Sequence, residues 1–249
     1  MKLVVTAFFM AWGMFWTVPC PLKWWDERGR IGMLLFLPCI GLMIGAVWAG
    51  LVWLRERYVP GLLGAGALAV APYVVSGFIH LDGYMDCADA VLSRRDQETR
   101  RKILKDSHVG SFAVVAVVIL FLLEYSVFAG YSFAGKWMYL PLVCAAPRAV
   151  CAYLVLGCKP LPGSSYEKMF SGGVPAAAKI AALAVMSALA AFPWIWLGRL
   201  ALHTVVAGEL GALLTVAYIR HDLGGMSGDV SGAGIIVGEL CALAALALL

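Results

Sequence analysis

Long apolar runs alternate with short polar ones along almost the whole chain. Runs that reach the ~20 residues needed to cross a bilayer core lie at about 31–54, 61–80, 109–131, 137–157, 176–197, 201–219 and 233–249. Residues 3–18 form a shorter run, which we interpret as a retained first membrane helix because the following T-V-P-C-P is not a signal-peptide cleavage site. The pattern predicts an all-α, polytopic integral membrane protein with seven or eight membrane helices, built as a single membrane-embedded domain over residues 1–249.

Composition supports this fold class and excludes several functions. Hydrophobic residues make up 62% of the chain and the mean hydropathy is +0.87, which an ordinary soluble domain does not reach. The net charge of +4 is too small and too scattered to indicate a nucleic-acid partner. The seven cysteines are odd in number and include no CxxC pair, so they favour neither a disulfide framework nor a zinc site.

The Lys and Arg residues predict the orientation of the chain in the membrane. If every run crosses, the loops near 21–30, 81–108, 158–175 and 220–232 share one side and carry most of the positive charge. Positive loops stay in the cytoplasm. We therefore expect these loops to be cytoplasmic, with the basic segment within 81–108 close to anionic membrane lipid.

The densest run of charge lies between Phe78 and Gly110 and contains three acids in register. Asp82, Asp86 and Asp89 occupy positions i, i+4 and i+7, which lie on one face of a helix. Carboxylates this close repel one another, and a divalent cation would relieve that repulsion. Ligand sets made only of oxygen suit Mg²⁺ or Mn²⁺. The spacing predicts a metal site at a cytoplasmic helix end, although a solvated helix end would also carry acids.

Two further acids lie in polar segments on the same predicted side. Asp106 follows the basic run, and Asp229 is flanked by glycines in G-D-V-S-G. Flanking glycines allow the backbone to approach a phosphate, and a flexible loop would explain them as well. We expect both acids to be ligands of a second ion or to form its outer shell.

Several basic residues are candidates for binding a diphosphate. They include Arg100, Arg101, Lys102 and Lys105, although such runs often face only solvent or lipid. His80 precedes the acids by two residues, where it could orient a carboxylate or serve as a structural hydrogen-bonding group.

Four charged residues fall inside apolar runs, where each needs a partner or a polar cavity. They are Arg148, Glu124, Glu209 and Glu239.

Two motifs resemble those of a known family. H-L-D-G-Y-M-D-C-A-D-A begins at His80 and K-D-S-H-V-G at Lys105, and G-G-M-S-G-D-V-S-G-A covers 224–233. Together they resemble the cobalamin synthases, or adenosylcobinamide-GDP ribazoletransferases. The family usually has Thr at Ser227 and Arg at His108. Both departures keep the polarity of the position.

The resemblance implies an enzyme of the bacterial or archaeal cell (inner) membrane. Such an enzyme joins adenosylcobinamide-GDP to α-ribazole or its 5′-phosphate and releases GMP, with Mg²⁺ (or Mn²⁺) as cofactor. On this interpretation the catalytic residues are Asp82, Asp86, Asp89 and Asp106. The substrate-binding residues are His80, Arg100, Arg101, Lys105, Arg148 and Asp229, and the metal ligands are Asp82, Asp86, Asp89 and Asp229.

Two other functions remain open from the sequence. A CDP-alcohol phosphotransferase also uses spaced acids at cytoplasmic helix ends, but its D-G-x-x-A-R pattern is missing, because Asp82-Gly83 is followed by Tyr-Met-Asp-Cys. A cation or solute transporter would place carboxylates near the bilayer midplane, in broken helices of two similar halves. Here the acids are expected at helix ends, and we find no internal repeat.

Overall fold

The structure is a computed structural model that describes residues 2–58 and 61–249. Within these residues the regular elements are helices, and one isolated β-bridge joins Pro160 to Met226. The α-helices are α1 (Lys2–Phe15), α2 (Arg30–Leu35), α3 (Leu37–Tyr58), α4 (Leu62–Val75), α5 (Ile79–Leu92), α6 (Gln97–Ile103), α7 (Ser111–Gly130), α8 (Leu140–Gly157), α9 (Ser165–Met169), α10 (Ala176–Leu197), α11 (Arg199–Leu223) and α12 (Gly228–Leu248). Short 3₁₀ turns cover Glu27–Gly29 and Trp137–Tyr139.

Six of the described helices are long and apolar enough to cross a membrane, and a bent pair can supply a seventh span. The six are α3, α7, α8 with the turn before it, α10, α11 and α12. The prediction of an all-α, polytopic membrane protein is confirmed. The predicted first membrane helix is α1, whose 14 residues rise only about 21 Å and are therefore short for a full crossing.

The predicted run 61–80 does not form one straight helix. It ends as α4 at Val75, and α5 leaves at 96° after a break of three residues, which we call the elbow. Gly77 and Phe78 both have left-handed backbone conformations there, with φ of +69° and +60°. That conformation stops a helix. The hydropathy pattern missed the elbow because the residues on both sides of it are apolar.

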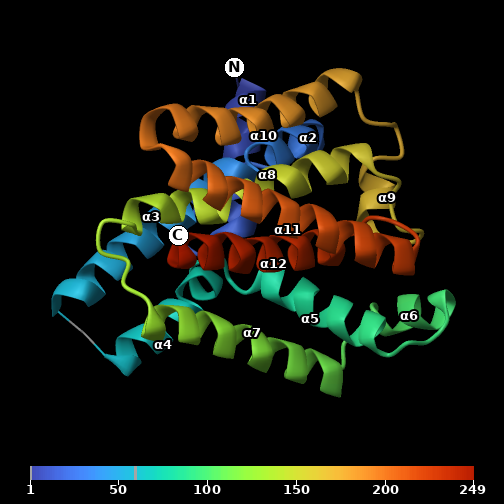
Figure 1. Cartoon of the computed structure of the whole chain (residues 1–249). Coiled ribbons are helices and arrows are strands. Elements are labelled where there is room, and N and C mark those ends of the chain that lie inside the picture. Colours follow the sequence, from blue (N-terminus) through green and yellow to red (C-terminus); the bar gives the residue numbers. More distant parts are fainter. Residues whose placement is uncertain (1, 59–60) are drawn as a thin grey trace.

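Helix α12 lies among α5, α8 and α11 and contacts all three (Figure 1). Small residues along it let the neighbours approach. A Cβ added at Gly232 would lie 2.9 Å from the His80 carbonyl oxygen, and one at Gly238 would lie 2.8 Å from that of Gly208. Close backbone approach through glycine is how helices pack where lipid removes the hydrophobic driving force.

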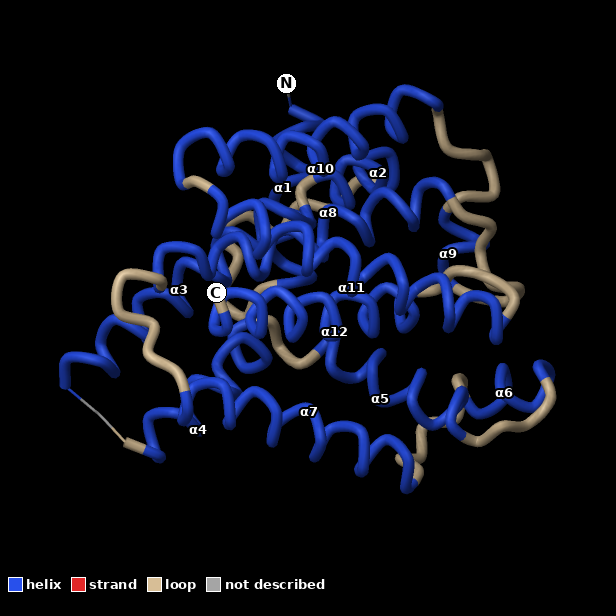
Figure 2. Tube along the Cα trace, in the orientation of Figure 1, coloured by secondary structure: helices blue, strands red, loops and turns tan. Residues whose placement is uncertain are grey.

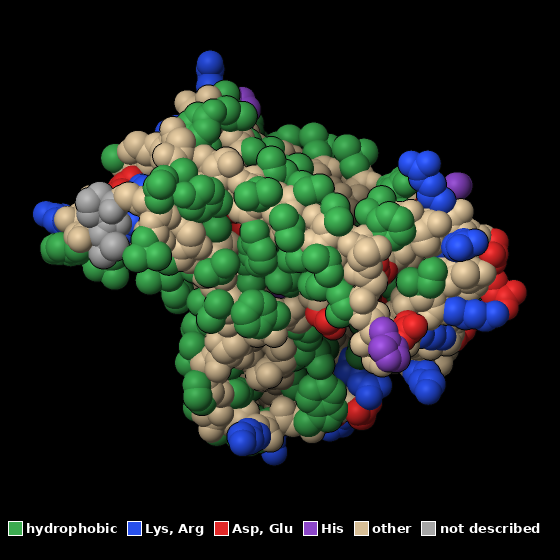
Figure 3. All heavy atoms as spheres, turned by 90° about the horizontal axis from the view of Figure 1, so that it is seen from below, with side chains coloured by type: hydrophobic (Ala, Val, Ile, Leu, Met, Phe, Trp, Pro, Cys, Tyr) green, Lys and Arg blue, Asp and Glu red, His purple; other side chains and the backbone are tan. Residues whose placement is uncertain are grey.

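The polar segments of the chain meet at one end of the bundle. The end of α5, the short helices α6 and α9, and the start of α12 lie on the right in Figure 1, and the loops between them are traced in Figure 2. Figure 3 shows Lys, Arg, Asp and Glu side chains concentrated at this end. Segments from the predicted loops 81–108, 158–175 and 220–232 therefore lie together, as the charge pattern predicted.

Candidate active site

The acidic face of α5 begins one turn after the elbow. Asp82 lies in the first turn of the helix and is exposed, whereas Asp86 and Asp89 are half-buried. All three fall within one uninterrupted helix, so the predicted i, i+4, i+7 spacing does place them on one face. Like-charge repulsion from Asp82 and Asp89 acts on Asp86.

Asp229 joins this face from the far end of the chain. It lies in the first turn of α12, whose N-cap Ser227 accepts a hydrogen bond from the Val230 N–H at 3.3 Å and donates one to Asp229 Oδ2 at 3.1 Å. A Cβ at Gly83 would lie only 2.7 Å from Asp229 Cα, so α5 and α12 touch through their backbones here. Asp229 consequently repels both Asp82 and Asp86.

Asp89 has an additional role that the sequence did not indicate. Its two carboxylate oxygens accept hydrogen bonds from the Gly110 N–H at 2.6 Å and the Ala113 N–H at 2.9 Å, which lie at the start of α7. A carboxylate there satisfies free N–H groups and interacts favourably with the positive end of the helix dipole. Asp89 therefore ties α5 to α7, and its oxygens keep further lone pairs that point to no other described donor.

Asp106 lies apart from these acids, in the exposed loop between α6 and α7. The ring and backbone nitrogens of His108 lie 2.7 Å and 3.0 Å from its Oδ1. The side-chain hydrogen bond with His108 lowers the pKa of Asp106 below its usual value. Within the described chain no hydrogen bond or ion pair links Asp106 to Asp82, Asp86 or Asp229.

The chemistry of the cluster suits a hard divalent cation, although the side chains do not form a closed metal cage. Among the described residues no three or more His, Cys, Asp or Glu side chains lie in an arrangement that could hold a metal ion by themselves. The donors that converge on Gly83 are all carboxylates, and none of Asp82, Asp86 and Asp229 has an ion-pair partner in the described chain. Oxygen donors with uncompensated negative charge fit Mg²⁺ or Mn²⁺.

Two arginines that were predicted to bind phosphate, Arg100 and Arg101, instead contact another helix of the protein. Arg100 forms an ion pair with Asp222 at 2.5 Å, and Arg101 Nε donates to the Leu223 carbonyl at 2.6 Å. Both contacts lie at the C-terminal end of α11. Positive side chains there donate to free carbonyl groups and interact favourably with the negative end of the helix dipole. Arg100 and Arg101 therefore fix α6 against α11.

Lys105 is different, because no described acid forms an ion pair with it. Its side chain lines a cavity of about 310 Å³ that also contains Asp229, and we call this cavity the serine pocket. The other lining residues are Leu104, Leu161, Gly163, Ser164, Ser165, Ser227 and Gly228. A basic side chain, several hydroxyl groups and the start of α12 together provide donors for an anion beside the acidic cluster.

The two loops that form this pocket are bonded to each other. The Leu161 N–H donates to the Met226 carbonyl at 2.8 Å, and the Met226 N–H donates to the Lys159 carbonyl at 2.9 Å. A Cβ at Gly225 would lie 2.4 Å from Leu161 Cα. The glycine before Met226 is therefore needed for the loop pairing that places Asp229.

Arg148 and His80 lie in the interior. Arg148 is 1% exposed and forms an ion pair with Glu239, and its guanidinium also donates to the Cys144 carbonyl at 2.6 Å. This contact provides the partner that both charges needed. His80 is 5% exposed and its ring stacks on Phe15, with centroids 5.7 Å apart. Both residues were predicted to bind substrate; the structure buries them and gives each a contact within the fold.

The remaining buried acids behave differently from each other. Glu124 accepts a hydrogen bond from the Tyr73 hydroxyl, which joins α7 to α4. Glu209 Oε1 has no hydrogen-bond partner among the described residues.

Sequence reasoning missed the contribution of the α8–α9 loop. Tyr166 lies beside the start of α12, with its hydroxyl 3.8 Å from the Cβ position of Gly228. Burial raises the pKa of Tyr166, and the Asp229 charge raises it further. The G-S-S-Y stretch at 163–166 is polar and lies between two apolar runs, and that signal could have marked it.

Comparison with known proteins gives a consistent result over the whole chain. The family described as cobalamin-5-phosphate synthase matches residues 7–247. A relative from Clostridium perfringens strain 13, named adenosylcobinamide-GDP ribazoletransferase, is 35% identical over 96% of both chains. A relative with the same name from Clostridium botulinum strain Alaska E43 is 30% identical over 98% of this chain and 97% of its own. Another from Carboxydothermus hydrogenoformans is 31% identical over 92% of this chain and 91% of its own. No solved structure matches the chain.

Proposed function

This chain belongs to the cobalamin-5-phosphate synthase family, and we propose on that premise that the acidic cluster between α5 and α12 is its Mg²⁺-dependent active site. The chain is a transferase of cobalamin biosynthesis that joins adenosylcobinamide-GDP to α-ribazole. The shared name of the relatives decides between this reaction and the phosphotransferase and transporter alternatives considered from the sequence.

The reaction sets three requirements for the protein. A hydroxyl oxygen of α-ribazole forms a bond to the phosphorus that stays on cobinamide, and the bond from that phosphorus to the bridging oxygen of the diphosphate breaks. GMP leaves with the bridging oxygen and its electron pair, and the hydroxyl proton passes to a base. The site must therefore hold a diphosphate, neutralise developing charge and accept one proton.

Asp82, Asp86 and Asp229 would hold the cation, and Asp89 adds charge from one turn further along α5. The bound ion would neutralise charge that develops on the diphosphate. Asp82 is the exposed member of the cluster, so it is also the carboxylate that can reach a substrate hydroxyl and take its proton. The role of Asp106, in its exposed loop, stays a prediction.

The serine pocket would receive the phosphates of the guanosine nucleotide. Lys105 carries the positive charge, and the hydroxyl groups of Ser164 and Ser165 add neutral donors, while the Ser227 hydroxyl donates to Asp229. Arg100 and Arg101 contribute indirectly, because their contacts with the end of α11 hold α6 and therefore the segment that leads to Lys105. The α-ribazole and its 5′-phosphate are both compatible with this arrangement.

We place the polar end of the bundle at the cytoplasmic face of a bacterial inner membrane. Lys and Arg side chains gather there (Figure 3), and positively charged loops stay on the cytoplasmic side. The charged substrates would then reach the site from the compartment in which nucleotides are made.

The observation that carries the proposal is the meeting of Asp82, Asp86 and Asp229 around Gly83, with no ion-pair partner among the described residues. The test incubates purified protein with adenosylcobinamide-GDP, α-ribazole and Mg²⁺ and measures GMP. We expect GMP release that excess EDTA abolishes and that Mg²⁺ or Mn²⁺ restores, whereas Zn²⁺ alone does not. Full activity in excess EDTA would refute the metal assignment.

A further inference from the structure

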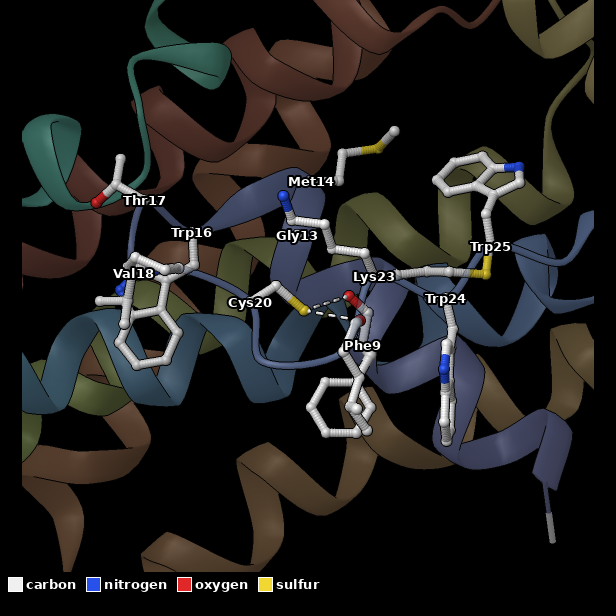
Figure 4. Close-up of a pocket in the computed structure, with 13 residues that line it drawn as sticks. Phe9, Gly13, Met14, Trp16, Thr17, Val18, Cys20, Lys23, Trp24 and Trp25 are labelled. Atoms are coloured by element: carbon white, nitrogen blue, oxygen red, sulfur yellow. Dashed lines mark hydrogen bonds between the residues drawn. The ribbon is translucent and has the colours of Figure 1, made fainter.

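An aromatic hollow lies between α1 and the loop that follows it (Figure 4). Its volume is about 490 Å³, within the range of pockets that hold small organic ligands. Four aromatic side chains form much of its wall: Phe9, Trp16, Trp24 and Trp25. Trp24 and Trp25 are 43% and 52% exposed, so indole surface remains open to a ligand.

Hydrogen bonds hold the loop that forms this hollow in place. The Trp12 indole N–H donates to the Val18 carbonyl at 2.8 Å, and the Cys20 thiol lies 3.2 Å from the Leu22 carbonyl. Thr17 donates twice to the Val75 carbonyl, from its backbone N–H and from its hydroxyl, each at 3.0 Å. The hollow is therefore preformed, which lowers the entropic cost of binding.

The hollow opens toward the acidic cluster. A second cavity, of about 450 Å³, shares Met14, Trp16 and Thr17 with it and is also lined by Asp82, Ile79 and the elbow residues 76–78. In Figure 4 Thr17 lies at the end of the hollow that faces the elbow, drawn in teal, and Trp24 and Trp25 lie at the opposite end. The two cavities are adjacent at these three residues, and together, as what we call the groove, their linings extend from the indoles to Asp82.

The junction between the two cavities has features of a ligand site. Phe78, at the elbow, holds a left-handed conformation that is uncommon for a bulky side chain, and such conformations concentrate at functional sites. The buried indole N–H of Trp16 has no acceptor among the described residues. A buried donor without a partner is costly, so a small movement of the Trp16 ring that brings its N–H to a ligand acceptor would be favoured.

We propose that this groove binds α-ribazole, with its planar aromatic base against Trp16 and its ribose hydroxyl at Asp82. This inference rests on the proposed function. Aromatic bases stack on indole faces, and the groove has indole surface at one end and the Asp82 carboxylate at the other. The groove thus delivers the nucleophile from one side of the cluster, and the serine pocket receives the nucleotide phosphates on the other.

The test compares Michaelis constants for the two substrates in the full-length protein. In Met14→Trp a larger side chain fills the junction from a position that is 39% exposed, and Met14→Leu keeps the original size as the matched control. Trp16→Ala removes the stacking surface, and Trp16→Phe should recover most of it. Trp196→Ala, at a 73% exposed indole on α10, controls for the loss of a surface tryptophan.

We expect Met14→Trp and Trp16→Ala to raise the KM for α-ribazole by about 10-fold or more. The KM for adenosylcobinamide-GDP should stay unchanged. Met14→Leu, which does not fill the junction, should raise the KM for α-ribazole far less than Met14→Trp does, and Trp196→Ala should behave as the unmodified protein. An unchanged KM for α-ribazole in Met14→Trp, or a rise for adenosylcobinamide-GDP instead, would overturn the proposal. If the proposed function itself were wrong, the unmodified protein would release no GMP, and this result is distinguishable from an unchanged KM in the variants.

Discussion

The carboxylates of α5 and of the start of α12 differ in what they contact, and this difference predicts how their variants behave. Asp82, Asp86 and Asp229 have no ion-pair partner in the described chain and repel one another, whereas Asp89 accepts two N–H groups of α7. Removing a charge from the first group relieves repulsion. Removing it from Asp89 weakens a contact between two helices.

The first prediction at the residue scale concerns Asp→Asn variants of these acids. In Asp82→Asn, Asp86→Asn and Asp229→Asn the turnover number should fall by roughly 100-fold or more, since charge stabilisation by a metal is worth several kcal/mol. Their melting temperatures should stay level or rise. Asp89→Asn should lose both activity and thermal stability, because an amide retains a single acceptor oxygen for the start of α7.

Asp96→Asn is the control for this series. Asp96 caps α6 by accepting from the Thr99 N–H at 3.0 Å, and Asn caps helices equally well. Measurements of kcat and melting temperature on all five variants separate the roles. The metal-site assignment fails if Asp96→Asn is as inactive as the others, or if the first three variants lose activity only because they unfold.

The sequence predicted part of this site because part of it is local. The spacing of Asp82, Asp86 and Asp89 is a property of one helix, and it placed them on one face before any fold was known. The capping role of Asp89 and the contacts of Arg100 with α11 depend on helices that are distant in the sequence. Residue spacing carries no information about such contacts. From the sequence Arg100 and Lys105 were therefore equivalent candidates, whereas in the structure Arg100 pairs with Asp222 and Lys105 lines the serine pocket.

At the scale of elements, the contact between α5 and α12 assembles the site. These helices pass each other through Gly83 and Gly232, and each glycine faces backbone atoms of the other helix. The resulting approach brings Asp229 to the acids of α5, although the two motifs are far apart in the chain. The buried ion pair of Arg148 with Glu239 joins α12 to α8 on another side.

The second prediction tests this contact by Gly83→Ala. The added Cβ would lie 2.7 Å from Asp229 Cα and 3.0 Å from its carbonyl oxygen, and backbone atoms cannot rotate away. The helices must separate, at a cost of about 1–3 kcal/mol for overpacking. We expect a lower melting temperature together with at least a tenfold loss of kcat, because Asp229 moves away from Asp82.

Gly50→Ala is the matched control, since a Cβ at that helical glycine would meet no atom within 4 Å. It should leave activity unchanged and stabilise α3 slightly, because alanine favours helix more than glycine does. Equal behaviour of the two variants would mean that the close approach of α5 and α12 does not position the acids.

Hydropathy alone predicted most of the helices but not how two of them are connected. The runs for α7, α8, α10 and α11 are confirmed because uninterrupted apolar stretches of that length have few other structures available in a membrane. The short first helix was expected, but the elbow at Gly77 and Phe78 was not, since backbone direction depends on φ and ψ and not on polarity. The elbow borders the groove, so the sequence could not have indicated it.

At the scale of the whole molecule, charge is distributed unevenly between the two ends of the helix bundle. The end formed by α6, α9 and the start of α12 gathers the polar loops (Figures 1 and 3), while the opposite end carries the start of α4 and the connection from α7 to α8. This asymmetry is the basis of the proposed orientation, in which the acidic cluster faces the cytoplasm.

The last prediction tests that orientation by labelling introduced cysteines in spheroplasts with a membrane-impermeant maleimide. Lys102→Cys and His221→Cys place the thiol at side chains that are 74% and 89% exposed at the polar end, and Ala134→Cys places it in an exposed loop at the opposite end. We expect the first two to react only after permeabilisation and Ala134→Cys to react in intact spheroplasts. The unmodified protein gives the background from its seven native cysteines. Labelling of Lys102→Cys or His221→Cys from outside would place the site on the wrong side of the membrane for a cytoplasmic nucleotide substrate, and the positive-inside argument would fail for this chain.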